Sequence, residues 1–329
     1  MPVSVRNKNK CSGREEERLR QQEVGRHGWT PAPPPHSLTI PLSVSVSIGL
    51  LQLLATDNNK MCDVEHCYSV VLEIVKSAGT VLAEGFKKTK KVTTKTSSSD
   101  LVTEYDKRIE SLIIDEILKT FPTHKFIGEE TASAEGLTND PTWMIDPIDG
   151  TNNFVHGDEN CVISIALAVN QVLEIGIVYS PIKDQLFSAK KGNGSWLNGK
   201  PIHVSDVTDI KQSLLGFEVS LAGIPKIKET VLKRLAAIVS QAHGVRAIGT
   251  CALSLCYVAQ GAWDAYQVDY LYCWDYAAGA LIVQEAGGTV ISTDGSPFEI
   301  MKRRIIAASS KQLADQLVTV LKQADSNLI

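Results

Sequence analysis

The chain has 329 residues, of which 43% are hydrophobic, so it can bury a sizeable core in one large or two smaller domains. The formal net charge is −4, but residues 1–60 carry 8 basic and 5 acidic side chains, and residues 61–329 therefore carry 25 and 32. This acidic body argues against nucleic acid as the main partner, and it predicts that bound cations hold any anionic substrate. The seven cysteines are odd in number and include no C-x-x-C pair, which argues against a disulfide framework or a zinc site and indicates a reducing, cytoplasmic compartment.

Residues 1–60 differ in composition from the rest of the chain. Their opening is polar and mixed in charge, and the PAPPPH segment at 31–36 cannot hold a helix or a central strand, so we predict a disordered extension. The uncharged run 38–55 has about the shortest length that could span a bilayer, but Pro41 and three serines interrupt it, which argues against a membrane anchor. The first well-patterned segment begins at Met61, and we predict one catalytic domain over residues 61–329, in two α/β halves that meet near residues 205–212.

The first half of this domain combines two amphipathic helices with antiparallel strands. Apolar residues recur at helical spacing, and a proline stops the second helix. The glycines of GNGSWLNGK indicate hairpin turns and not a phosphate loop, because no strand-to-helix context surrounds them. The predicted helices cover 62–86 and Thr103 or Asp106 to Phe121, a polar loop joins them, and the predicted strands cover 125–128, 142–145, 161–169, 172–179 and alternating segments within 185–204.

In the second half, helices and strands alternate. The predicted strands are 213–219, 245–248, 289–292 and 304–308, and the predicted helices are 226–243, 250–261, 274–286 and 311–323. Antiparallel hairpins followed by alternation predict a mixed α/β fold with no internal repeat.

The stretch WMIDPIDGTNNFVH, residues 143–156, carries the chemistry. Asp146 ends an apolar strand, and Pro147 prevents the simple continuation of the strand, so the turn brings Asp149 toward the same point. The carbonyl of Ile148 then has no strand partner and is also available as a ligand. Carboxylate and carbonyl oxygens suit a hard cation such as Mg²⁺. The alternative is that D-x-x-D only caps a turn.

Two more acids follow the same pattern. Glu129 ends a strand in a Gly-Glu-Glu turn, and Asp275 opens a helix; alone, the first would be solvated and the second an N-cap. Thr151, at the expected start of a helix, is either a cap or a donor to a water near the cations. If the carboxylates of Glu129, Asp146, Asp149 and Asp275 converged, they would repel one another unless cations neutralised them, so convergence predicts metal.

Three segments together resemble the inositol monophosphatase family of magnesium-dependent, lithium-sensitive phosphatases. They are GEE at 128–130, DPIDGTNNFVH at 146–156 and WDYAAGALIVQEAGG at 274–288. Their order and spacing extend the resemblance over about residues 62–325. The resemblance implies a layered α-β-α-β-α sandwich, a homodimer and two to three Mg²⁺ ions, with a small phosphorylated polyol as substrate.

The resemblance also implies roles for individual residues. Glu129, Asp146 and the Ile148 carbonyl would hold one Mg²⁺ and Asp146, Asp149 and Asp275 another, with Glu129 also touching a weaker third ion. Thr151, paired with Asp106 in the segment DLVTEYD, would position the nucleophilic water, which makes Thr151, Asp106 and Glu129 the expected catalytic residues. The expected substrate contacts are Gly150 and Thr151 through their backbone N–H groups, Asp149, Cys251, Asp269 and Asp275.

The sequence departs from the family in the part that recognises the alcohol. Family members carry a glutamate for the inositol hydroxyls seven residues before the Trp-Asp aspartate, and here that position is Val268. Either Asp269 replaces it after a local shift, or the preferred alcohol differs. Tyr270 and Tyr272 are large residues that could narrow the pocket. Three functions therefore stay open: hydrolysis of inositol monophosphate, hydrolysis of a nucleotide 3′-phosphate or sugar phosphate, and a catalytically silent, metal-binding dimeric paralogue.

Overall fold

The structure is a computed structural model that describes residues 62–89, 91–94, 101–131 and 136–326. The extension predicted over residues 1–60, with its apolar run 38–55, lies outside the described residues. Within the described ranges, no helix is both long and apolar enough to cross a membrane.

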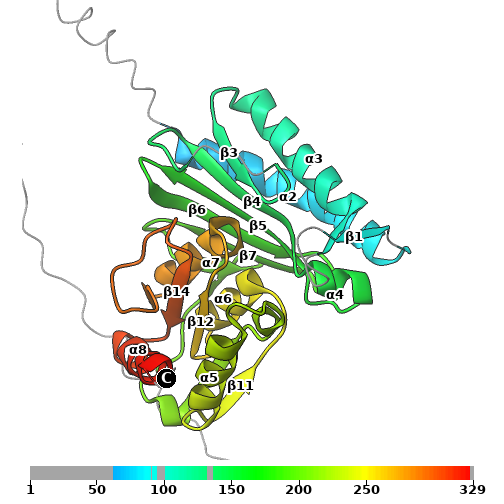
Figure 1. The fold of residues 1–329 in the computed structure, drawn as a ribbon. Coiled ribbons are helices and arrows are strands. Elements are labelled where there is room, and N and C mark those ends of the chain that lie inside the picture. The colour runs from blue at the N-terminus through cyan, green and yellow to red at the C-terminus, as the bar shows by residue number, and fades with distance from the viewer. Residues whose placement is uncertain (1–61, 90, 95–100, 132–135, 327–329) are drawn as a thin grey trace, which may run out of the picture. The chain divides into compact units, whose positions relative to one another are not determined.

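Most of the strands belong to two sheets (Figure 1). The larger sheet has the order β3-β4-β5-β6-β7-β8-β9, in which only β3 and β4 are parallel neighbours. Its strands are Lys125–Gly128, Thr142–Asp149, Val162–Val169, Val172–Ser180, Gln185–Lys190, Ser195–Leu197 and Lys200–Ile202. The smaller sheet has the order β11-β10-β12-β14-β13. Its strands, from β10 to β14, are Leu214–Phe217, Gly244–Arg246, Ala265–Asp269, Thr289–Ile291 and Arg304–Ala308. A separate hairpin pairs β1 (Val92–Thr94) with β2 (Leu101–Thr103).

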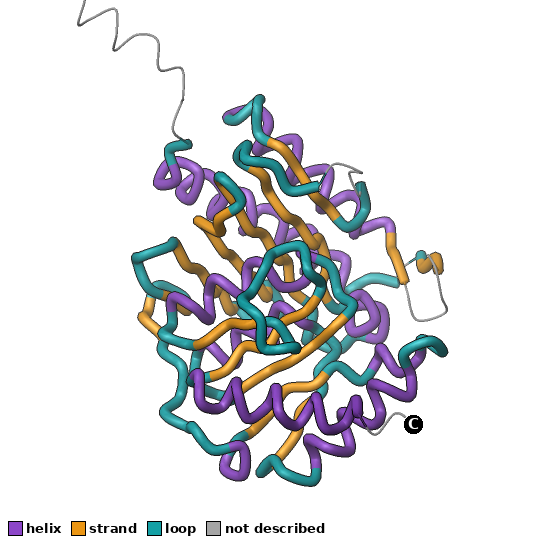
Figure 2. Tube along the Cα trace, turned by 60° about the vertical axis from the view of Figure 1, so that its left-hand side comes forward, coloured by secondary structure: helices purple, strands orange, loops and turns teal. Residues whose placement is uncertain are grey.

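The helices pack on these sheets in three layers (Figure 2). The first layer, α2 and α3, shares a core with the larger sheet, and the second, α6 and α7, packs between the two sheets. The third layer, α5 and α8, packs on the other face of the smaller sheet. The helices, from α2 to α8, are Val64–Phe86, Glu104–Thr120, Thr151–His156, Lys228–Val239, Cys251–Ala259, Cys273–Glu285 and Lys311–Ser326. The predicted α-β-α-β-α sandwich is confirmed.

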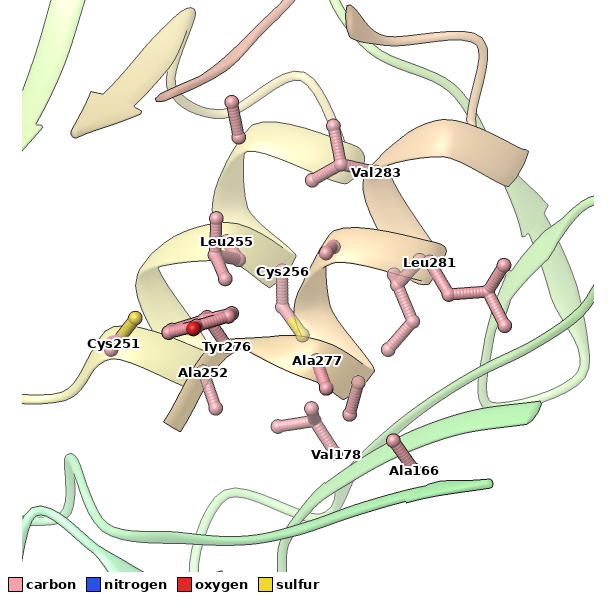
Figure 3. Close-up of a cluster of buried hydrophobic side chains, with 14 of the residues drawn as sticks. Ala166, Val178, Cys251, Ala252, Leu255, Cys256, Tyr276, Ala277, Leu281 and Val283 are labelled. Atoms are coloured by element: carbon pink, nitrogen blue, oxygen red, sulfur yellow. The ribbon is translucent and has the colours of Figure 1, made fainter. Parts of the chain in front are cut away.

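Side-chain alternation explains the layering. Along β4, Trp143 and Ile145 belong to the core under α2 and α3, while Met144 belongs to the core under α6 and α7. Because α6 and α7 are covered on both sides, 8 of the 9 residues of α6 and 9 of the 13 residues of α7 are buried, and most of these are apolar (Figure 3). The two helices approach so closely that a Cβ on Gly279 would lie 2.6 Å from Leu255 Cβ.

The structure differs from the sequence prediction in four places. The strand β12 was not predicted, although it is the central strand of the smaller sheet. The hairpin β1-β2 occupies part of the segment predicted as a polar loop. Helix α5 is shorter at both ends than the predicted 226–243, and β4 continues through Pro147 to Asp149. The other predicted helices and strands are present, with ends that shift by up to three residues.

Candidate active site

A bulge at the end of β4 places two aspartates on the same face. In the pairing of β4 with β5, Asp146 lies opposite Ser164 and Asp149 opposite Val162, so three steps on β4 match two on β5. The extra residue reverses the alternation of side chains, and two residues that would otherwise face opposite sides share one. The Ile148 N–H donates to the Asp146 carboxylate at 3.0 Å and closes this turn. Asp146 and Asp149 are almost fully buried.

The same register brings Asp275 to them. The hydroxyl of Ser164, beside Asp146 in the sheet, donates to the carbonyl of Trp274 at 3.0 Å and fixes the start of α7 over β5. Asp275 is the next residue, and its carboxylate accepts from the Tyr272 N–H at 2.6 Å, as a residue in the first helical turn can. Carboxylate oxygens of Asp146, Asp149 and Asp275 lie within 4.8 Å of one another.

Glu129 joins this cluster from the neighbouring strand. It follows β3, and its N–H donates to the Ile145 carbonyl at 3.1 Å, one residue before Asp146. A side-chain hydrogen bond with Glu129 contributes to the raised pKa of Asp146. The structure therefore brings together all four acids that were predicted to converge.

Electrostatics in this cluster favour the neutral acids. Burial and, after it, the negative charges of Glu129, Asp149 and Asp275 raise the pKa of Asp146 well above its ordinary value. Burial followed by the charge of Asp149 does the same to Asp275. Burial raises the pKa of Asp149 to about 7, although hydrogen bonds to its carboxylate act in the other direction. The cost of ionising these groups together is what bound cations would remove, and an all-oxygen ligand set fits a hard divalent cation.

Asp106 and Thr151 lie next to one another. Asp106 is fully buried in the first turn of α3, where one carboxylate oxygen accepts from the N–H and the hydroxyl of Thr103 at 2.8 and 2.6 Å. Its other oxygen is 3.3 Å from the Thr151 hydroxyl, which is also 3.0 Å from the Ile148 carbonyl. Thr103, and not Asp106, is thus the N-cap of α3, and the pair predicted from the resemblance is formed.

Gly150 allows the turn between β4 and α4. Its φ is +93°, in the left-handed region, and a Cβ there would lie 2.6 Å from the Asn160 carbonyl oxygen. Beyond the turn, the side-chain amide of Asn153 donates to the carbonyls of Asn160 at 2.6 Å and Ile248 at 2.7 Å. Asn153 therefore ties α4 to the segment that leads into α6.

The hydrogen bonds that support Asp149 were not predicted from the sequence. The Thr250 hydroxyl donates to the Asp149 carboxylate, and the Ala252 N–H donates to the same oxygen at 2.6 Å. Thr250 is also the N-cap of α6, since its hydroxyl accepts from the Leu253 N–H. A threonine between Gly249 and a long apolar helical run is a recognisable cap, but only the fold shows that it faces Asp149.

Glu110 is a second supporting residue that was missed. It lies on α3 one turn after Asp106, is 1% exposed, and accepts from the Glu130 N–H at 2.9 Å. Its carboxylate fills the space beneath Gly128, where a Cβ would come within 2.6 Å of it. An acid four residues after Asp106, and therefore on the same side of the helix, is the sequence signal that could have identified it.

The structure does not bring Asp269 to the cluster. Val268 packs in the core on the α6 and α7 side of β12, and the next residue in a strand faces the opposite side. There, the Asp269 carboxylate is bound by Arg234 at 2.8 Å and by the Thr293 hydroxyl at 2.6 Å. The expectation that Asp269 replaces the hydroxyl-binding glutamate is therefore wrong for this structure.

Cys251 and the two tyrosines are placed differently from one another. Cys251 is 3% exposed in the core at the start of α6 (Figure 3), and burial raises the pKa of its thiol well above the ordinary value. Tyr270 and Tyr272 are exposed, and Tyr272 stacks on Trp274 with ring centroids 4.6 Å apart and lies beneath the Arg303 guanidinium. Any contact of the Cys251 side chain with a substrate would need movement of its buried thiol.

Fold and geometry together define a five-layered α/β protein with a buried carboxylate site suited to divalent cations. The model of the inositol monophosphatase family matches residues 63–326. Inositol monophosphatase 2 of Mus musculus is 41% identical over 263 residues, which are 78% of this chain and 90% of the mouse protein. The chain belongs to the inositol monophosphatase family, and this makes it a phosphatase of that superfamily.

Solved structures agree with this assignment. The extragenic suppressor protein suhB of Bartonella henselae matches with a TM-score of 0.73 and 32% identity over 78% of this chain and 99% of that one. Inositol monophosphatase II of Staphylococcus aureus matches with a TM-score of 0.69 and 30% identity over 79% of this chain and 96% of the Staphylococcus aureus chain. SaIMPase-II, another similar structure, has been solved with inositol monophosphate bound and with 2′-AMP bound.

Proposed function

We propose that the chain is a Mg²⁺-dependent phosphomonoesterase whose first candidate substrate is inositol monophosphate. This proposal rests mainly on the cluster that Asp146 and Asp149 from the bulge of β4 form with Asp275 from α7, because the pKa shifts of these carboxylates show that ionising them together is unfavourable without cations. One Mg²⁺ would be held by Glu129, Asp146 and the Ile148 carbonyl, and another by Asp146, Asp149 and Asp275. Bound there, two or three such ions would neutralise the carboxylates, polarise the phosphoryl group and lower the pKa of a nearby water.

The chain's own residues would orient the reaction. The Thr151 hydroxyl lies between the Asp106 carboxylate and the Ile148 carbonyl, so it can donate a hydrogen bond to either oxygen while its own oxygen accepts a hydrogen bond from water. Because Asp106 is fixed by Thr103 and Thr151 by the start of α4, a water held by Thr151 would have one preferred direction of attack. The backbone N–H groups of Gly150 and Thr151 remain the predicted donors to the phosphate.

The alcohol part of the substrate is less constrained than the phosphate. Val268 cannot accept a hydrogen bond from a hydroxyl, and Asp269 is committed to Arg234. This favours two candidates side by side: inositol monophosphate bound with fewer hydroxyl contacts, and a nucleotide or sugar phosphate. The Staphylococcus aureus structures with inositol monophosphate and 2′-AMP are compatible with either choice.

Phosphate release from a panel of substrates tests the proposal. Inositol phosphates, sugar phosphates and phosphonucleotides would be compared with Mg²⁺ and after chelation, each with and without Li⁺. We expect Mg²⁺-dependent turnover of at least one of them and inhibition by Li⁺. If none is turned over, the silent, metal-binding paralogue is the correct alternative.

Val268→Glu tests the specificity argument directly. Restoring an acceptor should raise kcat/KM for inositol 1-phosphate by about 10-fold or more relative to the nucleotides, since one hydrogen bond to a charged group is worth about 1.5–3 kcal/mol. Val268→Met is the matched control, because it adds similar bulk without an acceptor. An equal change for all substrates, or the same gain with methionine, would show that position 268 does not select the alcohol.

A further inference from the structure

The side chains of Cys62, Cys67 and His124 lie close together at the start of α2. The sulfur atoms of Cys62 and Cys67 are 3.5 Å apart, and a nitrogen of His124 lies within 4.8 Å of both. Cys62 precedes the N-cap Asp63 of α2, and Cys67 is one turn inside the helix. These are the two positions whose side chains meet across a helix start, so the backbone itself holds the thiols together.

The two thiols differ in exposure and in environment. Cys67 is fully buried in the core beneath α2 and α3, whereas Cys62 is half-buried. A hydrogen bond from Cys67 and, after it, one from His124 lower the pKa of the Cys62 thiol below its ordinary value, against burial and the charge of Asp63. The pKa of Cys67 is raised by the same hydrogen bond and by burial. The greater exposure of Cys62 and the directions of the two pKa shifts both indicate that Cys62 is the more reactive thiol.

The tautomer of the neutral His124 ring distinguishes thiol chemistry from metal binding at this cluster. The buried indole N–H of Trp143 donates to His124 Nδ1 at 3.0 Å, so in the neutral ring the proton is on Nε2. The ring can then donate from Nε2 to the Cys62 sulfur. A metal bound through Nε2 would need the proton on Nδ1, where it would oppose the Trp143 N–H and leave that buried donor without an acceptor. This geometry favours thiol chemistry over a Cys-Cys-His metal site.

We propose that Cys62 and Cys67 are a hydroperoxide-sensitive thiol pair that closes to a reversible disulfide. The Cys62 thiolate attacks one oxygen of the hydroperoxide, the O–O bond breaks, and the leaving oxygen takes a proton from solvent, which leaves a sulfenic acid on Cys62. The Cys67 sulfur then attacks the Cys62 sulfur and forms the S–S bond, and the departing hydroxide takes the Cys67 proton to become water. In sum, two thiols and one hydroperoxide give one disulfide, one alcohol (or water, from hydrogen peroxide) and one water.

The chain offers a direct readout of this reaction. Trypsin cleaves after Lys60 and Lys76, and the peptide 61–76 contains Cys62 and Cys67 and no other cysteine. The reduced full-length protein would be treated with hydrogen peroxide, alkylated and digested. We expect that both cysteines of this peptide escape alkylation and that its mass is two hydrogen atoms below that of the reduced, unalkylated peptide. A thiol reductant should reverse the change. Oxidation of Met61 adds an oxygen atom and is distinguished by mass.

Variants separate the two roles. Cys67→Ser should stop at the sulfenic acid, which a 1,3-dicarbonyl reagent traps on residue 62, while Cys62→Ser should leave Cys67 reduced and unlabelled. Cys161, Cys251, Cys256 and Cys273, followed in the same digest, should keep their thiols. The proposal is overturned if Cys62 and Cys67 stay as reduced as these four, if Cys62 pairs only with a cysteine outside the peptide, or if the purified protein carries one zinc per chain that blocks alkylation of both.

Discussion

Replacing Asp149 by asparagine should abolish turnover and at the same time stabilise the metal-free protein. Thr250 and Ala252 both donate to the same Asp149 oxygen, so an asparagine carbonyl can keep both bonds and turn its NH₂ group toward Asp146 and Asp275. Burial is the largest cause of the raised pKa of Asp149, and the charge of Glu218 also raises it. A neutral amide at this position removes both costs.

The raised pKa of Asp149 sets both the upper limit and the pH dependence of the expected gain in stability. Raising the pKa of Asp149 from 3.8 to about 7 corresponds to roughly 4 kcal/mol of lost stability when the group is ionised. Because the folded-state pKa is the higher one, the folded state binds the proton more tightly, and stability is lost as pH rises through about 7. The variant should therefore match the wild type near pH 4 and exceed it by up to about 4 kcal/mol at pH 8, a rise in Tm on the order of 10 °C.

The assay is urea and thermal unfolding in a chelator at both pH values, with turnover measured separately in Mg²⁺. Asp115→Asn, on the exposed side of α3, is the matched control and should change neither quantity. The reasoning is refuted if Asp149→Asn is no more stable than the wild type at pH 8, or if the gain is the same at pH 4. Turnover near the wild-type rate would refute the role of Asp149 as a ligand.

Three further predictions follow from the described contacts. Thr151→Ala should lower kcat by about 10²–10³ with little change in KM, because it removes the hydroxyl beside Asp106; an unchanged kcat in steady-state assays would contradict its role. Gly279→Ala should destabilise the protein by about 1–3 kcal/mol in urea unfolding, since its Cβ would lie 2.6 Å from Leu255 Cβ; no loss would mean that α6 and α7 can move apart. A chain that starts at Met61 should keep full turnover and solubility, and loss of both would assign the extension a structural role.

The periodic patterns of the sequence predicted most of the helices and strands, whereas the layered sandwich was expected from the family resemblance. The long helices α2, α3 and α8 have one apolar face, and β5 and β6 are apolar stretches separated by Asn170-Gln171, both at positive φ. Pro147 correctly marked an irregularity between Asp146 and Asp149, but the predicted end of the strand before Pro147 was wrong, because β4 continues through a bulge to Asp149. These features depend on neighbours in the chain.

The error at Asp269 has a specific cause. The strand β12 reads AYQVD, too short and too mixed for its alternation to be recognised, and the side-chain direction of Val268 and Asp269 depends on that alternation. Once β12 pairs with β10 and β14, neighbouring residues must face opposite layers, and Asp269 meets Arg234 from α5. As long as β12 is not recognised as a strand, the sequence does not show that Val268 and Asp269 face opposite sides of a sheet.

The middle helical layer holds together acids that are far apart in the sequence. Asp149 comes from the larger sheet, yet its carboxylate is bound by the hydroxyl and N–H groups at the start of α6, and Asp275 comes from α7, which packs directly on α6. The Thr250 hydroxyl and the Ala252 N–H therefore offset part of the repulsion through hydrogen bonds to the ionised form. A substitution that moves α6 relative to β4 should weaken cation binding even when every ligand is intact, because the ligand Asp149 and its hydrogen-bond donors belong to different layers.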